Sequence, residues 1–471
     1  MLRTLLSPFA IGVASRIVAQ VSAFVLILVA SRALGLAEFG SYAIASALSV
    51  IFTTLVYTGV YQLILRTRDL PADRDTLFAL QFAIGAAGTL IMAVIGLSLG
   101  NLADRGTAYA LVGLAPIPLL ASFSAWLEAH LVREGRVRTT AILVLMSELV
   151  ALATAVGMFH AGYGIEALIL SRLASMAFIL VLYAALVRIA PKPKVERATA
   201  RRGLTEAWPL WGSATLGMLS NYGADLILGA FLNPTAVGAY RAGSRIANTA
   251  ADVVTQPMGI ISWAQFARQE AANNQSRIRT LWKNNVALCF ALLAPAMISV
   301  SILAAEIVSV LLDPSWSPAV TIISILAIAR LADSLSFLLE PTLTCLGRGK
   351  QQFFVRVGDA LLLVLLLLSI GWQSPEAAAL AVLVRTYITM VVSLALMMRA
   401  AGITLSDLVT VTLPGLGLTA LCLSVILLVG LLPLAAGSTA LLVATATAEL
   451  VAWSLCFALL LRSRVLVMPA L

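Results

Sequence analysis

Apolar runs of about twenty residues recur along this chain, separated by short polar loops. A run of this length crosses the hydrocarbon core of a bilayer as one α-helix. Apolar residues make up 61% of the 471 residues and charged residues only 11%, so too little polar surface is left to cover a water-soluble fold. The sequence therefore predicts an all-α polytopic membrane protein and excludes most classes of soluble enzyme.

The runs predict about 14 transmembrane helices. Their expected spans are 8–34, 39–65, 77–100, 108–132, 140–160, 165–188, 208–231, 237–265, 284–311, 318–346, 353–372, 375–398, 408–430 and 437–461. The polar segment 190–207 divides them. We therefore expect four parts: an N-terminal six-helix bundle (1–189), a basic cytoplasmic linker (190–207), a C-terminal six-helix bundle (208–400), and two additional helices with a short tail (401–471).

The distribution of Lys and Arg predicts the orientation. The termini and the loops after even-numbered helices hold 23 of the 31 basic residues, whereas the loops after odd-numbered helices hold only Arg105. Because cytoplasmic loops carry the excess of Lys and Arg, both termini are expected in the cytoplasm. The net charge of +9 thus reflects topology, and no nucleic acid partner is expected. The linker is either solvated or lies as a basic amphipathic segment on anionic headgroups.

One short motif occurs in both halves, at Gly35–Ser46 and at Asn233–Ser244. Glycine permits close approach of two backbones, and we expect each tyrosine at the membrane interface with its hydroxyl in water. An even number of helices in each half gives a pseudo-twofold axis along the membrane normal. The matching residues, all separated by 198 positions, are Gly40 and Gly238, Tyr42 and Tyr240, and Ser46 and Ser244.

Segments 31–48 and 232–246, which contain this motif, resemble the corresponding segments of bacterial polysaccharide-transport flippases for O-antigen and exopolysaccharide. Their superfamily also includes multidrug and toxin extrusion transporters and the lipid II flippase. The resemblance implies two six-helix bundles that form a V around a central cavity and work by alternating access. It also implies transfer of an undecaprenyl-diphosphate-linked oligosaccharide from the cytoplasmic to the periplasmic leaflet of the inner membrane. The expected partners are this substrate, membrane lipids, and a glycan polymerase and other proteins of the pathway.

Ionisable side chains inside the expected spans are candidates for function. A charge at membrane depth costs about 2.5 kcal/mol or more and needs a partner or a water-filled cavity. Ion pairs within a bundle are the common structural alternative. The candidates are Arg16, Glu148, Arg172, Asp225, Arg241, Arg245, Asp252, Arg330, Asp333, Glu340, Asp359, Arg385 and Glu449.

The expected eighth helix carries the clearest pattern. At about 100° per residue, five of its polar side chains fall within about an 80° arc. This stripe is expected to face a cavity or, alternatively, to form a buried network with another helix. Arginine suits a diphosphate because its planar fork donates two parallel hydrogen bonds and stays charged. The stripe consists of Arg241, Arg245, Asn248, Asp252 and Gln256.

Further candidates lie on other helices. Arg16 and Gln20 are one turn apart on the first helix, and the resemblance implies cationic side chains in the cavity on the first and eighth helices. Arg385 on the twelfth helix has no apparent partner in the sequence and is expected to line the cavity.

Two acids are candidates for ion coupling, Asp225 and Asp333. Asp225 on the seventh helix could pair with Arg241 or could bind a proton or Na⁺. Asp333 lies three residues after Arg330, and the two are expected to satisfy each other. Glu340 shares the face of Asp333.

Three function classes compete. A flippase for lipid-linked glycans is favoured by the fourteen helices and the arginine stripe. A Na⁺- or H⁺-coupled multidrug exporter of the same superfamily prefers an acid-rich, aromatic-lined cavity and usually twelve helices. A membrane glycosyltransferase or polymerase tends to carry long catalytic loops, which are lacking here. Because no nucleophile–base pair, phosphate loop or metal-ligand spacing occurs, we expect no enzymatic activity, metal or cofactor. The cysteines and histidines that such sites would use show no such spacing; they are Cys289, Cys345, Cys422, Cys456, His130 and His160.

Overall fold

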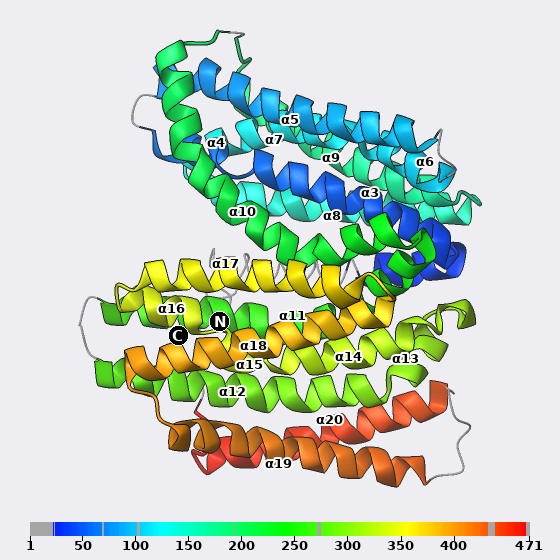
Figure 1. Cartoon of the computed structure of the whole chain (residues 1–471), viewed down its shortest axis with the longest axis vertical. Coiled ribbons are helices and arrows are strands. Elements are labelled where there is room, and N and C mark those ends of the chain that lie inside the picture. The colour runs from blue at the N-terminus through cyan, green and yellow to red at the C-terminus, as the bar shows by residue number, and fades with distance from the viewer. Residues whose placement is uncertain are drawn as a thin grey trace. The chain divides into compact units, whose positions relative to one another are not determined.

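The computed structural model describes residues 22, 24–67, 70–100, 104–192, 194–270, 275–431 and 439–467, which form helices and no strand. The chain divides into two compact units, Met1–Gly238 and Ala239–Leu471 (Figure 1). The all-α prediction is therefore confirmed.

The N-terminal unit is built around α7. This helix packs against α3, α4, α5, α8 and α9, and α10 lies along α3, α4 and α5 (Figure 1). Large side chains such as Trp126, Tyr183 and Ile64 fill the space between the helices. The helices of this unit are α3 (Leu36–Val56), α4 (Val60–Arg66), α5 (Leu70–Gly100), α6 (Arg105–Leu114), α7 (Pro116–Arg133), α8 (Val137–His160), α9 (Ile165–Val187) and α10 (Arg197–Phe231).

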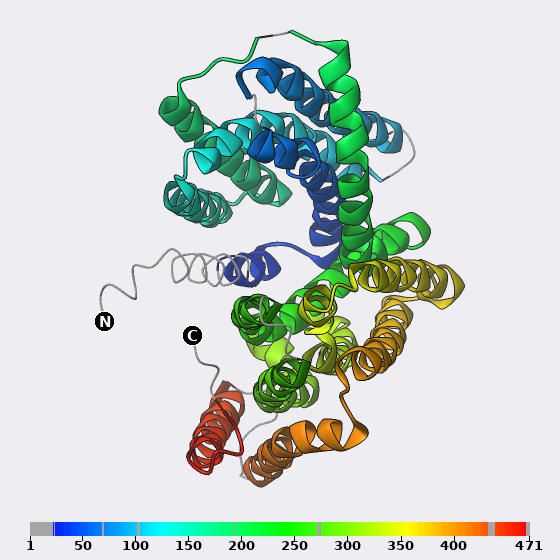
Figure 2. The ribbon, with the colours of Figure 1, turned by 90° about the vertical axis from the view of Figure 1, so that its left-hand side faces the viewer.

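In the C-terminal unit, α14 packs against α12 and α18, and α17 pairs with α18. At one edge α19 packs on α12, and α20 lies beside α19 (Figure 2). The helices are α11 (Pro234–Glu270), which begins just before the division, α12 (Gln275–Ile302), α13 (Ala304–Leu311), α14 (Ala319–Leu331), α15 (Asp333–Ser336), α16 (Leu339–Cys345), α17 (Gly349–Leu366), α18 (Pro375–Ala401), α19 (Leu405–Gly430) and α20 (Thr439–Arg462).

Eleven segments of the described chain are long and apolar enough to cross a membrane. The more polar helices α10 and α11 and the short apolar helix Phe24–Ala33 bring the total to the number expected from the sequence. The chain is thus a multi-pass membrane protein.

Four expected spans are interrupted in the structure. The span at 39–65 is divided into α3 and α4, that at 108–132 into α6 and α7, that at 284–311 into α12 and α13, and that at 318–346 into α14, α15 and α16. Apolar periodicity cannot reveal such breaks, because the hydrophobic run continues through them.

Within the segment 190–207, α10 begins at Arg197, and the part before it is bonded to α5. Thr76 donates a hydrogen bond to the carbonyl of Lys194 at 3.3 Å and accepts one from the N–H of Glu196 at 3.0 Å. The buried carboxylate of Asp73 forms an ion pair with Arg202. These contacts hold the segment against the start of α5.

The repeated motif has the same local structure in both copies. The Ser46 hydroxyl donates to the carbonyl of Ala43 and the Ser244 hydroxyl to that of Arg241, each at 3.0 Å. The expectation that the two tyrosine hydroxyls lie in water is wrong, because Tyr42 and Tyr240 are only 8% and 6% exposed. Their hydroxyls instead face arginines of their own units, since Tyr42 interacts with Arg172 and Tyr240 with Arg330.

Candidate transport site

The polar stripe lies on one face of α11, which continues as a single helix through Pro257. The positions from Arg241 to Gln256 are three or four residues apart, so their side chains follow one another along the helix. Arg241, Arg245, Asn248 and Asp252 are half-buried and Gln256 is exposed. This face of α11 thus carries partly buried polar groups where a membrane-spanning helix ordinarily carries apolar side chains.

The inner part of the stripe belongs to an interhelical network. Arg330 of α14 donates two hydrogen bonds to Oδ1 of Asn248, from Nε at 2.8 Å and from Nη2 at 2.5 Å. Its Nη1 bonds Asp333 at 2.7 Å, which confirms the ion pair expected between these two residues. The Asp252 carboxylate also attracts Arg330 electrostatically. One guanidinium therefore joins α11, α14 and α15.

The outer part of the stripe is more cationic. Arg241 and Arg245 lie in the first turns of α11, ahead of the residues that contact Arg330. Guanidinium groups held on neighbouring turns of one helix form a surface to which a diphosphate can bind through several charge-assisted hydrogen bonds.

The expectation that Arg385 is isolated is wrong. Its Nη1 donates to Asp359 Oδ2 at 3.1 Å, and the other oxygen of that carboxylate accepts a hydrogen bond from Thr389 at 2.7 Å. The side chains of Arg385 and Asp359 are only 14% and 20% exposed. The sequence contains both residues among its candidates but gives no sign of their pairing, because they lie on different helices.

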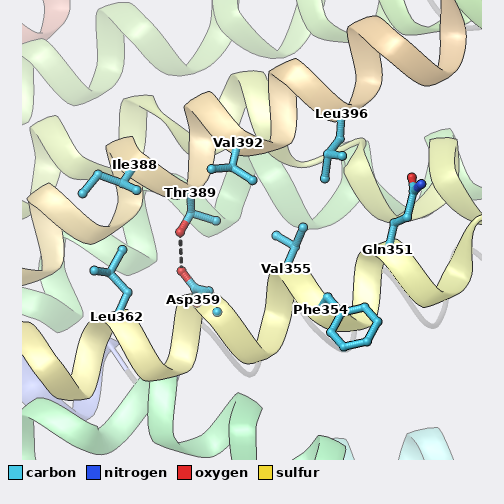
Figure 3. Close-up of a pocket in the computed structure, with 10 residues that line it drawn as sticks. Gln351, Phe354, Val355, Asp359, Leu362, Ile388, Thr389, Val392 and Leu396 are labelled. Carbon is cyan, nitrogen blue, oxygen red and sulfur yellow. Dashed lines mark hydrogen bonds between the residues drawn. The ribbon is translucent and has the colours of Figure 1, made fainter.

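Asp359 and Thr389 line a cavity of about 480 Å³ between α17 and α18, and Figure 3 shows their hydrogen bond between the two helices. Gln351 is the only other polar side chain of the lining. Such a cavity can accept an aliphatic chain but offers few hydrogen bonds to a glycan. The remaining lining residues are Phe354, Val355, Gly358, Leu362, Ile388, Val392 and Leu396.

The other candidates from the sequence have different positions. Asp225 lies on α10 in the N-terminal unit and is fully buried, whereas Arg241 belongs to the C-terminal unit. Arg16 and Gln20 lie outside the described residues.

Most remaining charges in the spans have partners within their own unit. Arg172 of α9 pairs with Glu148 of α8 at 3.5 Å, and Arg356 of α17 pairs with Glu340 of α16. Glu449 of α20 accepts a hydrogen bond from Ser299 of α12 at 2.8 Å. These contacts tie neighbouring helices together, which is the structural use of intramembrane charge. Among the described residues, no group of His, Cys, Asp and Glu side chains could hold a metal ion.

One carboxylate was missed in the sequence. Glu128 of α7 accepts a hydrogen bond from the Tyr61 hydroxyl at 3.3 Å, next to the turn between α3 and α4. The signal that could have found this site is the pair Tyr57 and Tyr61, one helical turn apart, with Gly59 between them.

Residues 29–321 match the sequence model of a family described as "Polysaccharide biosynthesis protein". No curated protein sequence matches the chain.

Solved structures share the fold. The fold is similar to that of "Lipid II flippase MurJ, inward closed conformation", with a TM-score of 0.76 and 12% identity over 97% of this chain and 99% of that chain. A MATE family multidrug resistance transporter of the MOP superfamily in its inward-facing conformation gives 0.63 and 10% identity over 82% and 95%. An outward-facing MATE structure gives 0.55 and 12% identity over 84% and 96%. At these identities the likeness concerns the fold.

Proposed function

This chain belongs to the polysaccharide biosynthesis protein family, and we propose that it flips an undecaprenyl-diphosphate-linked oligosaccharide from the cytoplasmic to the periplasmic leaflet of the bacterial inner membrane. The flipped unit is then used to build a surface polysaccharide. The mechanism is alternating access, and both termini lie in the cytoplasm. No chemical bond of the substrate changes.

The observation that carries the proposal is the extent of the structural likeness. The lipid II flippase structure matches 97% of this chain, whereas the MATE structures match only 82% and 84% while covering nearly all of their own chains. About a sixth of this chain therefore has no counterpart in them, a length close to that of α19, α20 and the loops around them. A lipid-linked substrate needs more apolar surface than a small drug, and two additional apolar helices supply it.

We place the diphosphate of the substrate at Arg241 and Arg245 of α11. Both are half-buried arginines on one helical face, and a guanidinium keeps its charge and its bidentate geometry when water is removed. The residues Asn248, Asp252 and Gln256 continue this face, with Asn248 positioned by Arg330. Arg16 and Gln20 complete the proposed substrate-binding set from the first helix.

Arg385 and the acids have supporting roles in this proposal. Arg385 contributes through Asp359, which lines the cavity between α17 and α18 and pairs with its guanidinium. Asp225 is the candidate for ion coupling on α10, because it is fully buried. Asp333 could exchange a cation only by giving up its ion pair with Arg330.

The competing function is export of drugs coupled to Na⁺ or H⁺, which the MATE-like fold favours. Deletion of the gene separates the two functions. The flippase proposal predicts loss of surface glycan and accumulation of lipid-linked repeat units on the cytoplasmic leaflet, restored by the wild-type gene. Normal surface glycan together with altered drug tolerance, in a strain with no second flippase, would contradict it.

A further inference from the structure

A turn at Gly59 breaks the second transmembrane segment into two helices. α3 ends at Val56, α4 starts at Val60, and Gly59 between them has φ of +60°, a left-handed conformation that glycine adopts without strain. A Cβ on Gly59 would lie 2.3 Å from Nε1 of Trp211 on α10. The turn is therefore closed by the indole ring.

Side chains satisfy the carbonyl groups that the break releases. Trp211 Nε1 donates to the carbonyl of Leu55 at 3.0 Å, and Nε2 of the buried Gln81 donates to that of Val56 at 3.2 Å. Irregular backbone at membrane depth is tolerated only where protein or water takes up its hydrogen bonds. Broken helices of this kind recur at ion and substrate sites of transporters.

A carboxylate surrounded by phenols lies next to this break. The Tyr61 hydroxyl donates to Glu128 Oε1 at 3.3 Å. Tyr57 and Tyr183 also interact with the Glu128 carboxylate. The rings of Tyr57 and Tyr61 have their centroids 5.7 Å apart. Three helices thus contribute to one site, which we name the Glu128 site and define as Glu128, Tyr57, Tyr61 and Tyr183.

Among the residues that the structure describes, no ion pair balances the charge of Glu128. The titratable groups of the described chain that act on it are the tyrosines from the α3–α4 turn and from α9, and the packed helices α5, α8 and α10 bring no charged group to it. Arginine partners hold Glu148 and Asp359 in their places. Neutralising either of these acids would strand a partly buried cation, whereas neutralising Glu128 strands none within the described chain.

The site also has unused hydrogen-bonding capacity. Tyr183 is 0% exposed, and its hydroxyl acts on the Glu128 carboxylate without reaching the geometry of a full hydrogen bond. The buried Gln81 Oε1, beside the carbonyls of Leu55 and Val56, has no hydrogen-bond partner within the described chain. Unsatisfied buried polar atoms are costly. A carboxylic acid brings an O–H donor that the ionised form lacks, and the Tyr183 oxygen is an acceptor in reach of it.

We propose that the Glu128 site binds a proton during the transport cycle. A proton taken from water bonds to one carboxylate oxygen of Glu128 and removes its negative charge. The new O–H donates to the Tyr183 oxygen, while Tyr61 loses the ionised acceptor that it bonds. Release of the proton to water on the other side reverses each step. The occupancy of the site thereby acts on the α3–α4 break, which Tyr57 and Tyr61 adjoin.

The first experiment detects the proton itself and needs no transport. Infrared spectra of the purified full-length protein in lipid nanodiscs are recorded through a pH titration. A carboxylic acid C=O band that disappears as pH rises should be present in the wild type and lost in Glu128→Gln. Tyr183→Phe should move the band, because the acceptor of the O–H is gone. Glu134→Gln is the matched control, since Glu134 is an exposed acid just after α7, and it should keep the band unchanged.

Two outcomes would overturn the proposal: a wild-type protein without a titrating acid band, or a Glu128→Gln spectrum with the full band of the wild type. Thermal unfolding of each variant in the same nanodiscs separates a lost site from a lost fold.

The second experiment tests coupling, and it rests on the proposed function. In proteoliposomes, a pH gradient should change the rate at which the wild type flips lipid-linked oligosaccharide, and Glu128→Gln should flip at a rate that no longer responds to the gradient. An unchanged response in Glu128→Gln contradicts coupling through this site. If the wild type flips nothing but still shows the acid band, the proposed function fails and the proton site stands.

Discussion

Gly40 and Gly238 each lie against the first residue of the other's helix. A Cβ on Gly40 would be 1.7 Å from the carbonyl oxygen of Pro234, and one on Gly238 would be 2.1 Å from that of Leu36. Leu36 and Pro234 are themselves the first residues of α3 and α11. Both pairs are 198 positions apart and lie within the first compact unit, so the glycine of each motif copy meets the helix start of the other copy. The repeat in the sequence is thus also a contact in space.

Alanine at either glycine should therefore destabilise the protein to a similar degree. A methyl group would have to displace backbone rather than a flexible side chain, and overpacking of this kind costs about 1–3 kcal/mol or more. We expect lower abundance and a lower Tm for Gly40→Ala and for Gly238→Ala, measured by fluorescence-detected thermal unfolding. Gly100→Ala is the control, since a Cβ there would meet only the Ala108 methyl at 3.6 Å. Equal Tm values for all three variants would rule out the close contact.

The ion pair between Arg385 and Asp359 should be structural at least in part. Removing one partner of a buried pair costs about 3–5 kcal/mol in soluble proteins, because the other charge is stranded. Arg385→Gln and Asp359→Asn should each lower abundance and Tm, and the double variant should regain much of the loss. Glu340→Gln, which breaks the exposed pair with Arg356, should change Tm little. Additive losses in the double variant would argue against the pairing.

The outer and inner parts of the α11 stripe should respond differently to substitution. Asn248→Ala removes the acceptor of two hydrogen bonds from Arg330, so we expect a loss of about 1.5–3 kcal/mol, the range for bonds to charged groups, seen as lower abundance.

Arg245→Ala should instead abolish transport with abundance near normal, and Arg245→Lys should restore it only in part, because lysine lacks the bidentate fork. If Asp252 were the structural partner of Arg245, removing both side chains would recover abundance and transport. That recovery in the double variant would refute a ligand role for Arg245.

The sequence predicted the helices well because each membrane span requires its own long apolar run. The Gly40 and Gly238 motifs were also visible, since close backbone contact restricts a position to one residue type. Breaks such as the turn at Gly59 were not predicted, because the hydrophobic run from 39 to 65 continues past it.

Contacts between side chains on different helices were the other feature that the sequence did not predict. Arg330 and Asp333 are three residues apart on successive helical turns, so their pairing follows from helix geometry. Arg385 and Asp359 meet only because α17 packs on α18, and Glu128 meets its tyrosines only because α7 packs on α4 and α9. Contacts of this kind depend on tertiary packing, which a single sequence does not encode in any local pattern.

The basic loops should face the cytoplasm. A reporter that is active only in the cytoplasm should work when fused near Lys194, where the segment is bonded to α5. One that is active only in the periplasm should work when fused near Ser315, in the short turn before α14. Reversed activities would invert the topology that Lys and Arg predict.

The central claim is that the protein moves a lipid-linked glycan between leaflets. The most direct measurement uses the purified protein in liposomes that carry a labelled undecaprenyl-diphosphate oligosaccharide in both leaflets, with a glycan-cleaving enzyme added outside. We expect the protected fraction to fall from about half to near zero with the wild type and to stay at half with Arg245→Ala or with empty liposomes. A protected fraction that stays at half with folded wild-type protein would contradict the claim.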